Sequence, residues 1–120
     1  MSAGEFNFIG KYAIERGATW RVRIQLVDDD EIPLSLIGYT AKMQVRKTIS
    51  SSTVLAELST ANGRISLTDG ALGYIDLEIT SADTTPMEWN RGVYDLEITY
   101  QTIVSRVLYG TIETSKEVTR

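Results

Sequence analysis

Apolar and polar residues alternate in several short segments of the chain, which is typical of β-strands with one buried face. In residues 20–26, Arg21, Arg23 and Gln25 separate four apolar residues, and a similar alternation runs through residues 39–46. A period of two places the apolar side chains on one face of a strand and the charged side chains on the other. Each segment therefore predicts a strand that contributes one face to a core.

Turn residues separate the alternating segments. An acidic run at 28–31 follows the first predicted strand, and Asn62-Gly63 lies between apolar segments at 54–58 and 64–68. The Asn-Gly dipeptide suits the positive φ angles of a tight turn. We therefore expect the two flanking segments to form a β-hairpin.

The second half of the chain contains one break in the alternation. Residues 81–89 predict a short helix or turn that Ser81 caps and Pro86 ends. A last strand is expected over residues 104–113. Gly110 within it is expected to mark a bulge or a point where two backbones come close together.

An octapeptide occurs twice in the sequence. Residues 73–80 read G-Y-I-D-L-E-I-T and residues 92–99 read G-V-Y-D-L-E-I-T, so the copies agree at six of eight positions. In each copy the leucine and the last isoleucine share one face of the predicted strand, and the aspartate and glutamate share the other. Two strands of the same design are therefore predicted, each with an acidic outer face.

The predicted elements amount to about six to eight strands with short connections and at most one helical turn. One helical turn cannot cover the apolar face of a sheet, so two sheets must cover each other. We therefore expect one all-β domain over residues 1–120, an antiparallel β-sandwich with exposed or flexible tails at 1–5 and 117–120. A small barrel is the alternative way to close such a structure.

Composition narrows the possible chemistry. The 120 residues fit one domain, and the formal charge of −4 argues against a surface for nucleic acid. Histidine and cysteine are absent from the sequence, which excludes disulfides, a Ser-His-Asp triad, a cysteine nucleophile and the usual zinc ligands. Neither a secretory signal nor a stretch of about 20 apolar residues is present. We expect no catalytic activity and no cofactor.

Carboxylates are the remaining candidates for chemistry. Asp76, Glu78, Asp95 and Glu97 of the octapeptides could supply an acid and a nucleophile, and the acidic run at 28–31 could offer oxygen ligands to calcium. Acidic side chains are common on strand faces exposed to water, and the run lacks the ligand spacing and the glycine of a calcium loop. The favoured interpretation is structural in both cases.

The acidic strand faces also have basic counterparts on other predicted strands. Opposite charges on neighbouring strands stabilise a sheet by about 0.2–1 kcal/mol per pair. In the second octapeptide we expect Asp95 to form such a pair with Arg46 or Arg106.

Exposed aromatic side chains often anchor protein interfaces. Phe6, Phe8 and Tyr12 alternate with polar residues near the start of the chain, and Trp89 lies in the irregular segment before the last strands. These four residues are candidate partner contacts, although the first three could instead belong to a terminal strand packed on the core. Trp89 is also the one well-placed aromatic for carbohydrate binding, which is the alternative function.

Several segments follow an order that resembles a known family. They are Tyr12–Trp20 (YAIERGATW), Leu34–Arg46 (LSLIGYTAKMQVR), the turn at Asn62–Ile65 and Val93–Ile98 (VYDLEI). The chain is similar to small bacteriophage structural proteins and to the N-terminal domain of the upper baseplate protein of lactococcal-type phages. The resemblance implies an immunoglobulin-like sandwich in a tail, baseplate, neck or fibre-attachment complex, without catalytic residues.

The expected function is therefore that of a non-enzymatic virion adaptor, made in the cytoplasm of a bacterial host. Its expected partners are other tail, neck or baseplate proteins, with several copies in a symmetric ring and with neither nucleic acid nor membrane as a partner. In that family a fibre or receptor-binding part often follows the domain. Because the chain ends at Arg120, an adaptor is favoured over a receptor-binding protein.

Overall fold

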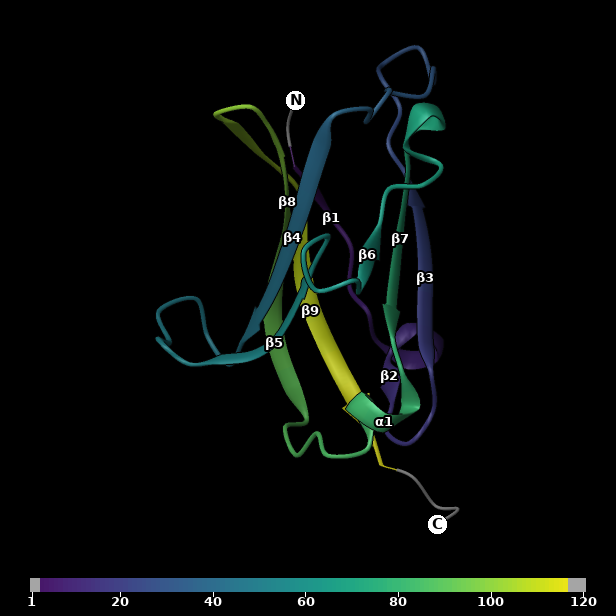
Figure 1. Ribbon diagram of the computed structural model, residues 1–120. Helices are drawn as coiled ribbons and strands as arrows, with labels where there is room; N and C mark the ends of the chain where they lie inside the picture. The colour runs from purple at the N-terminus through teal and green to yellow at the C-terminus, as the bar shows by residue number, and fades with distance from the viewer. Residues whose placement is uncertain (1–2, 117–120) are drawn as a thin grey trace.

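Two β-sheets pack face to face in the computed structural model of the chain, which describes residues 3–116 (Figure 1). The large sheet has six strands in the order β1-β9-β8-β4-β5, with β2 pairing with β9 as well. The small sheet has the order β3-β7-β6. The predicted all-β sandwich is confirmed.

The strands and helices have the following bounds. The large sheet contains β1 (Gly4–Glu5), β2 (Ile14–Glu15), β4 (Tyr39–Arg46), β5 (Val54–Ser59), β8 (Arg91–Tyr100) and β9 (Ile103–Ser115). The small sheet contains β3 (Trp20–Gln25), β6 (Ile65–Ser66) and β7 (Tyr74–Ile79). Helical turns are η1 (Gly10–Tyr12), η2 (Gly70–Leu72) and α1 (Ser81–Thr84). Among the helices of residues 3–116, none is long and apolar enough to cross a membrane.

The longest strands of the large sheet, β8 and β9, are longer than any strand of the small sheet. β8 has 10 residues and β9 has 13, whereas β3 and β7 have six each. The hairpin that joins β8 to β9 curves away from the small sheet at the upper left of Figure 1. The large sheet therefore continues past the small sheet at this end.

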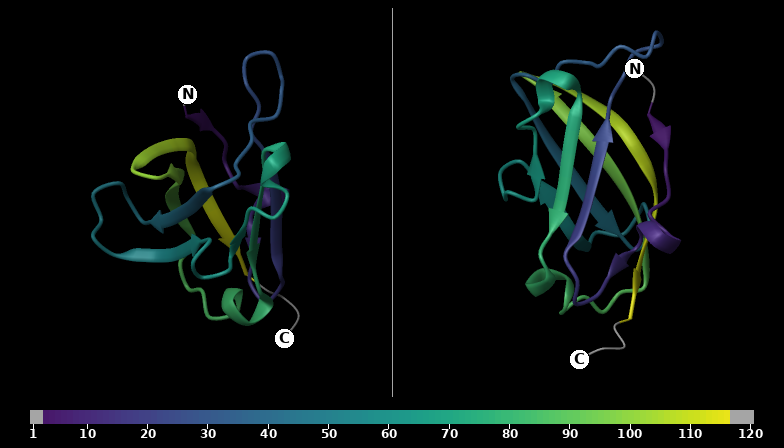
Figure 2. Two further views of the ribbon diagram at one scale, coloured as in Figure 1. Left: turned by 45° about the horizontal axis from the view of Figure 1, so that its top comes forward. Right: turned by 90° about the vertical axis from the view of Figure 1, so that its right-hand side faces the viewer.

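The N-terminal segment runs along β9, as the right-hand view of Figure 2 shows. β1 and β2 both pair with it in parallel, and an isolated bridge joins Phe8 to Ile112 between them. Gly4 and Glu5, which were expected in a tail, are exposed but belong to β1. Ala3, also expected in a tail, is half-buried and outside any strand. The rest of the two predicted tails, residues 1–2 and 117–120, lies outside the described residues.

The predicted hairpin around Asn62-Gly63 is wrong. The turn exists, because the Asn62 Oδ1 accepts the N–H of Ser59 at 2.9 Å and Gly63 has a φ of +80°. However, β5 pairs with β4 in the large sheet and β6 pairs with β7 in the small sheet, so the turn connects two sheets. Ile65 explains the crossing, since it lies opposite Leu77 and is only 2% exposed.

The short helix was predicted correctly, but its cap was not. Thr80 is the N-cap residue of α1, its side chain makes no capping hydrogen bond, and Ser81 lies inside the helix. Gly110 is a point of close approach, as expected, because a Cβ at this position would collide with the carbonyl oxygen of Phe6. The irregularity in the ladder lies elsewhere, next to Leu96.

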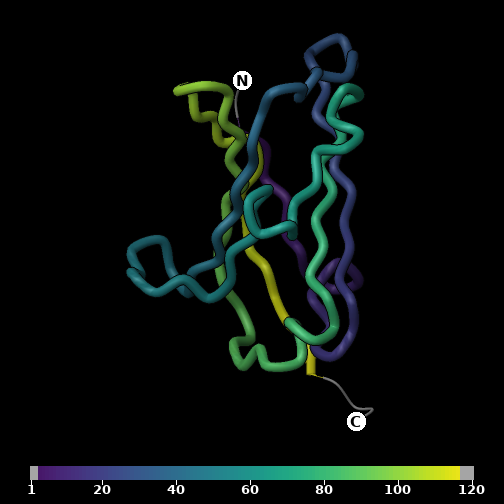
Figure 3. Tube along the Cα trace, in the orientation of Figure 1, coloured from purple at the N-terminus to yellow at the C-terminus, as the bar shows by residue number. Residues whose placement is uncertain are grey.

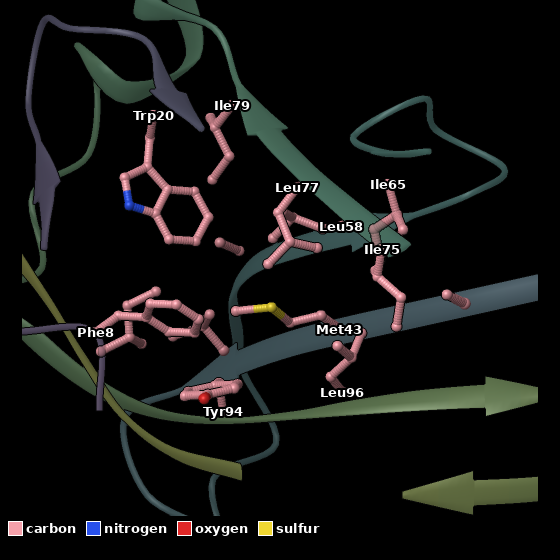
Figure 4. Packing of buried hydrophobic residues seen from close by; sticks show 14 of the residues in the cluster. Phe8, Trp20, Met43, Leu58, Ile65, Ile75, Leu77, Ile79, Tyr94 and Leu96 are labelled. Atoms are coloured by element: carbon pink, nitrogen blue, oxygen red, sulfur yellow. The ribbon is translucent and has the colours of Figure 1, made fainter. Parts of the chain in front are cut away.

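Both octapeptides contribute to the core between the sheets. Leu77 and Ile79 of β7 and Leu96 and Ile98 of β8 are at most 2% exposed. Met43 of β4 lies between the side chains of the two sheets (Figure 4). The alternation therefore predicted the inner face of each copy.

Tyr94 introduces a polar group at the edge of this core. Its hydroxyl donates a hydrogen bond of 2.6 Å to the carbonyl oxygen of Phe6, and its ring packs against Phe8 with 5.0 Å between centroids. Burial raises the pKa of Tyr94 above its ordinary value, and the negative charge of Glu5 adds to this effect. Tyr94 therefore holds the N-terminal segment against β8.

Candidate functional site

One end of the sandwich gathers exposed apolar side chains. We call it the loop end and define it by residues 27–38, 70–72 and 100–104, which lie at the top of the trace in Figure 3. Among the described residues, seven of the 13 exposed large hydrophobic side chains belong to it. They are Val27, Ile32, Ile37, Leu72, Tyr100, Ile103 and Val104.

Hydrogen bonds and ring contacts connect the three segments of the loop end. The N–H of Leu36 donates to the carbonyl oxygen of Gly70 at 2.7 Å, which joins the β3–β4 connection to η2. Tyr39, the first residue of β4 after this connection, has its ring 5.1 Å from that of Tyr100, which joins the end of the connection to the β8–β9 hairpin. The three segments that carry the exposed apolar side chains are therefore held together at one end of the sandwich.

The length of the large sheet explains part of this exposure. Tyr39, Tyr100 and Ile103 lie opposite one another in the ladder, so their side chains share the inward face of the sheet. Tyr100 is 40% exposed and Ile103 is 67% exposed. The small sheet thus leaves the end of an apolar face uncovered.

The acidic run forms an ordered loop at the same end. The Asp28 Oδ1 accepts the N–H groups of Asp30 at 2.8 Å and Ile32 at 3.0 Å, and a bridge between Val27 and Pro33 closes the base of the loop. Asp29, Asp30 and Glu31 are exposed. Within residues 3–116, no group of three or more acidic side chains is arranged to hold a metal ion.

The first octapeptide has its outer acids paired. Arg21 contacts Glu78 and Arg23 contacts Asp76 at 2.7 Å, in each case directly across the β3–β7 ladder. Arg23 also reaches Asp69 at 2.6 Å. Hydrogen bonds to Asp76 and Asp69 raise the pKa of Arg23, which keeps this guanidinium charged.

The predicted pairing of Asp95 is wrong. No ion pair of Asp95 or Glu97 occurs within the described part of the chain. Asp95 lies opposite Gln44 and Tyr109, neither of which is basic. Arg46 instead donates to Gln44 and to the Ser51 carbonyl, at 2.9 and 2.8 Å.

The remaining residue of that prediction, Arg106, also has another partner. It lies opposite Glu97 in the ladder, but its guanidinium sits 4.9 Å from the centre of the Tyr109 ring. The predicted residues nevertheless come together around a shallow hollow of about 450 Å³ on the outer face of the large sheet. Its lining includes Arg46, Asp95, Glu97, Arg106 and Tyr109, so it presents charges of both signs.

Trp89 lies beside a larger hollow at the opposite end of the sandwich. This hollow measures about 850 Å³, and its apolar lining consists of Leu55, Ala56, Pro86, Met87 and Trp89. The indole packs partly on the core, and its Nε1 is buried with no hydrogen-bond partner among residues 3–116. Trp89 is the sole aromatic in the described lining, so the hollow offers one aromatic ring and no platform of several rings for a sugar.

The three aromatics near the start of the chain have separate environments. Phe8 is a core residue with 1% exposure, as expected for a terminal strand packed on the core. Phe6 and Tyr12 are 40% and 46% exposed, and their rings meet edge to face at 5.4 Å. Of these three aromatics, only Phe6 and Tyr12 are exposed enough to contact a partner. Both lie outside the loop end.

Sequence reasoning did not identify the loop end. Ile37 lies between two predicted strands, and Ile103 lies just before the last one, so neither alternation included them. A signal was present, because residues 34–37 contain three apolar residues in a connection where polar residues are usual.

Comparison with models of known protein families found no match, and no curated protein matches the chain.

Proposed function

We propose that this protein is a non-enzymatic structural adaptor that acts by binding other proteins through its loop end. The observation that carries the proposal is the gathering of seven exposed apolar side chains on one ordered end of the sandwich. Large apolar patches rimmed by polar residues mark interaction sites, because exposing them to water is unfavourable. A partner that covers this end would remove that cost.

The character of the side chains supports a protein partner. Tyr100 offers an aromatic ring with a polar tip, and Ile37 and Ile103 are 71% and 67% exposed. Buried aromatic and aliphatic anchors supply most of the binding free energy at protein interfaces. Backbone hydrogen bonds order the segment 27–38, and the pairing of Tyr100 with Ile103 orders the β8–β9 hairpin. The backbone that carries these side chains is therefore ordered before binding, which reduces the entropy lost on association.

The distribution of polar groups gives little support to catalysis. Asp76 and Glu78 are engaged by arginines on the small sheet, while Asp95 and Glu97 lie on the outer face of the other sheet. Histidine and cysteine are absent from the whole sequence. A general acid or base that titrates near neutral pH would therefore need a strongly shifted carboxylate.

The assembly proposed for this adaptor is a bacteriophage virion, in its tail, neck, baseplate or fibre-attachment complex. The support is the family resemblance of the sequence segments together with a small sandwich that has one end suited to docking. Several copies arranged in a ring would give each loop end an equivalent environment. Phe6 and Tyr12 could then form a second, smaller contact.

The experiment uses matched isoleucine substitutions in particles assembled with the protein. Ile37→Ser and Ile103→Ser remove apolar side chains of the loop end, and Ile49→Ser removes the most exposed isoleucine, 91% exposed and away from this end. All three should change the free energy of unfolding by less than about 0.5 kcal/mol because these side chains are exposed. Incorporation into particles, measured by quantitative mass spectrometry, should fall for the two loop-end variants only. Equal incorporation of all three would contradict the proposal.

A further inference from the structure

We propose that the partner surface that docks on the loop end is basic, with lysine or arginine side chains around an apolar or aromatic centre. This inference rests on the proposed function, since it specifies the chemistry of the partner at the same site. Complementary charges at an interface accelerate encounter and select among partners. The charges at the rim of the loop end therefore indicate what the partner must present.

The negative charge of the loop end belongs to the loop at 28–31. Asp28 uses one carboxylate oxygen to accept two backbone N–H groups, so it helps to shape the loop. Asp29, Asp30 and Glu31 are exposed, and none of them forms an ion pair within the described part of the chain. Three carboxylates thus remain available at the surface.

The three segments that define the loop end supply no compensating positive charge. The segments 27–38, 70–72 and 100–104 contain neither lysine nor arginine. Arg23 is the basic residue next to η2, but Asp76 and Asp69 already bind it. At physiological ionic strength, exposed charges more than about 8 Å apart are largely screened from each other. More distant basic residues therefore contribute little. The exposed carboxylates of the loop end can therefore be neutralised by positive charges that a partner brings.

Apolar side chains lie directly among these carboxylates. Ile32 follows Glu31 in the same loop and is 59% exposed, and Val27 at its base is 42% exposed. Leu72 of η2 is 59% exposed. A partner must therefore cover aliphatic side chains and also approach carboxylates, which a basic rim around an apolar centre does.

The same charges disfavour other occupants. Phosphate groups of nucleic acid or of an anionic membrane surface would be repelled by the exposed carboxylates. Among residues 3–116, no group of three or more acidic side chains is arranged to bind a divalent cation. A basic protein surface is the occupant that satisfies both the charge and the apolar area.

The test selects displayed random peptides on the immobilised protein and compares their binding to variants. One variant carries Asp29→Asn, Asp30→Asn and Glu31→Gln. The control neutralises three carboxylates outside the loop end, Glu88→Gln, Asp95→Asn and Glu97→Gln, and so has the same net charge. A third variant, which carries both Ile37→Ser and Ile103→Ser, reports whether a peptide binds the loop end at all.

Selected peptides should carry lysine or arginine beside aliphatic or aromatic residues. Their affinity should fall about tenfold for the loop variant at low salt, and it should stay unchanged for the control. The difference should shrink at about 1 M salt, where charges are screened within roughly 3 Å. Peptides that need Ile37 and Ile103 but carry no positive charge would overturn this inference and leave the proposed function intact. If no selected peptide loses affinity when Ile37 and Ile103 are replaced by serine, both this inference and the proposed function are overturned.

Discussion

The two octapeptides have nearly the same sequence, but they lie in different electrostatic surroundings. Residues 74–79 form β7 in the small sheet, and the outer acids of this copy contact Arg21 and Arg23. The second copy lies in β8 of the large sheet, and its outer acids form no ion pair in the described chain. They line a hollow instead.

The comparison separates what a strand sequence determines from what its neighbours determine. Alternation alone sends Leu77 and Leu96 into the core, because side chains along a strand point to opposite faces. The partner of an outer side chain depends on which strand lies beside it and in which register. Asp76 lies opposite Arg23, whereas Asp95 lies opposite Gln44 and Tyr109.

The largest expected effects concern the shared inner faces. Leu77→Ala and Leu96→Ala should each lower the free energy of unfolding by about 2–5 kcal/mol, because both leucines are at most 1% exposed and their removal leaves cavities. Urea unfolding would measure both values. A loss below about 1 kcal/mol in one copy would show that the two inner faces are not equivalent.

The third position of the octapeptide is Ile75 in the first copy and Tyr94 in the second. Only Tyr94 has a hydroxyl that can form a hydrogen bond. Tyr94→Phe removes the hydrogen bond to the Phe6 carbonyl oxygen and should cost about 1–2 kcal/mol. Ile75→Val, a small core change in the first copy, serves as the matched control for packing. Amide hydrogen exchange should rise in residues 4–8 for Tyr94→Phe only, and an unchanged N-terminal segment would contradict the role of this bond.

The raised pKa of Tyr94 also predicts a pH dependence. The folded state binds the phenol proton more tightly than the unfolded chain, whose tyrosine has a pKa of 10.0. The stability from this group is therefore fully present below about pH 10 and is lost as the pH rises toward the higher folded pKa. Unfolding measured from pH 8 to 11 should decline more steeply for the wild type than for Tyr94→Phe. Parallel curves would contradict this assignment.

Neutralising one outer acid in each copy tests the electrostatic difference itself. Asp76→Asn should lower stability because it leaves Arg23 with one carboxylate fewer, and Asp95→Asn should leave stability nearly unchanged. The loss for Asp76→Asn should be smaller than that for Tyr94→Phe, since exposed ion pairs contribute little. It should also diminish in concentrated salt. Equal losses for the two variants would show that Asp95 has a partner after all.

The smallest expected effect comes from making the second copy resemble the first. Gln44→Arg places an arginine opposite Asp95, as Arg23 lies opposite Asp76, and Glu57 lies on the other side of Gln44. The variant should gain about 0.2–1 kcal/mol of stability. Combining Gln44→Arg with Asp95→Asn should abolish most of the gain, which a double-mutant cycle would measure. A loss of stability would show that repulsion from Arg46 outweighs the new pair.

The sequence predicted the fold class because alternation and turn residues are local properties. The inner faces of β3, β4, β7 and β8 follow from them. Strand partners are not local, so the crossing after Asn62-Gly63 and the neighbours of Asp95 could not be predicted. The loop end was missed for a related reason, since the exposure of Tyr100 and Ile103 depends on how far the small sheet reaches along the large one.

The most direct test of the docking role of the loop end is residue-level solvent footprinting of the protein, free and in its assembled state. Labelling should fall in residues 27–38, 70–72 and 100–104 on assembly. It should stay constant at residues 86–90, beside the hollow at the opposite end. Protection confined to residues 86–90, with the loop end labelled equally in both states, would contradict the account.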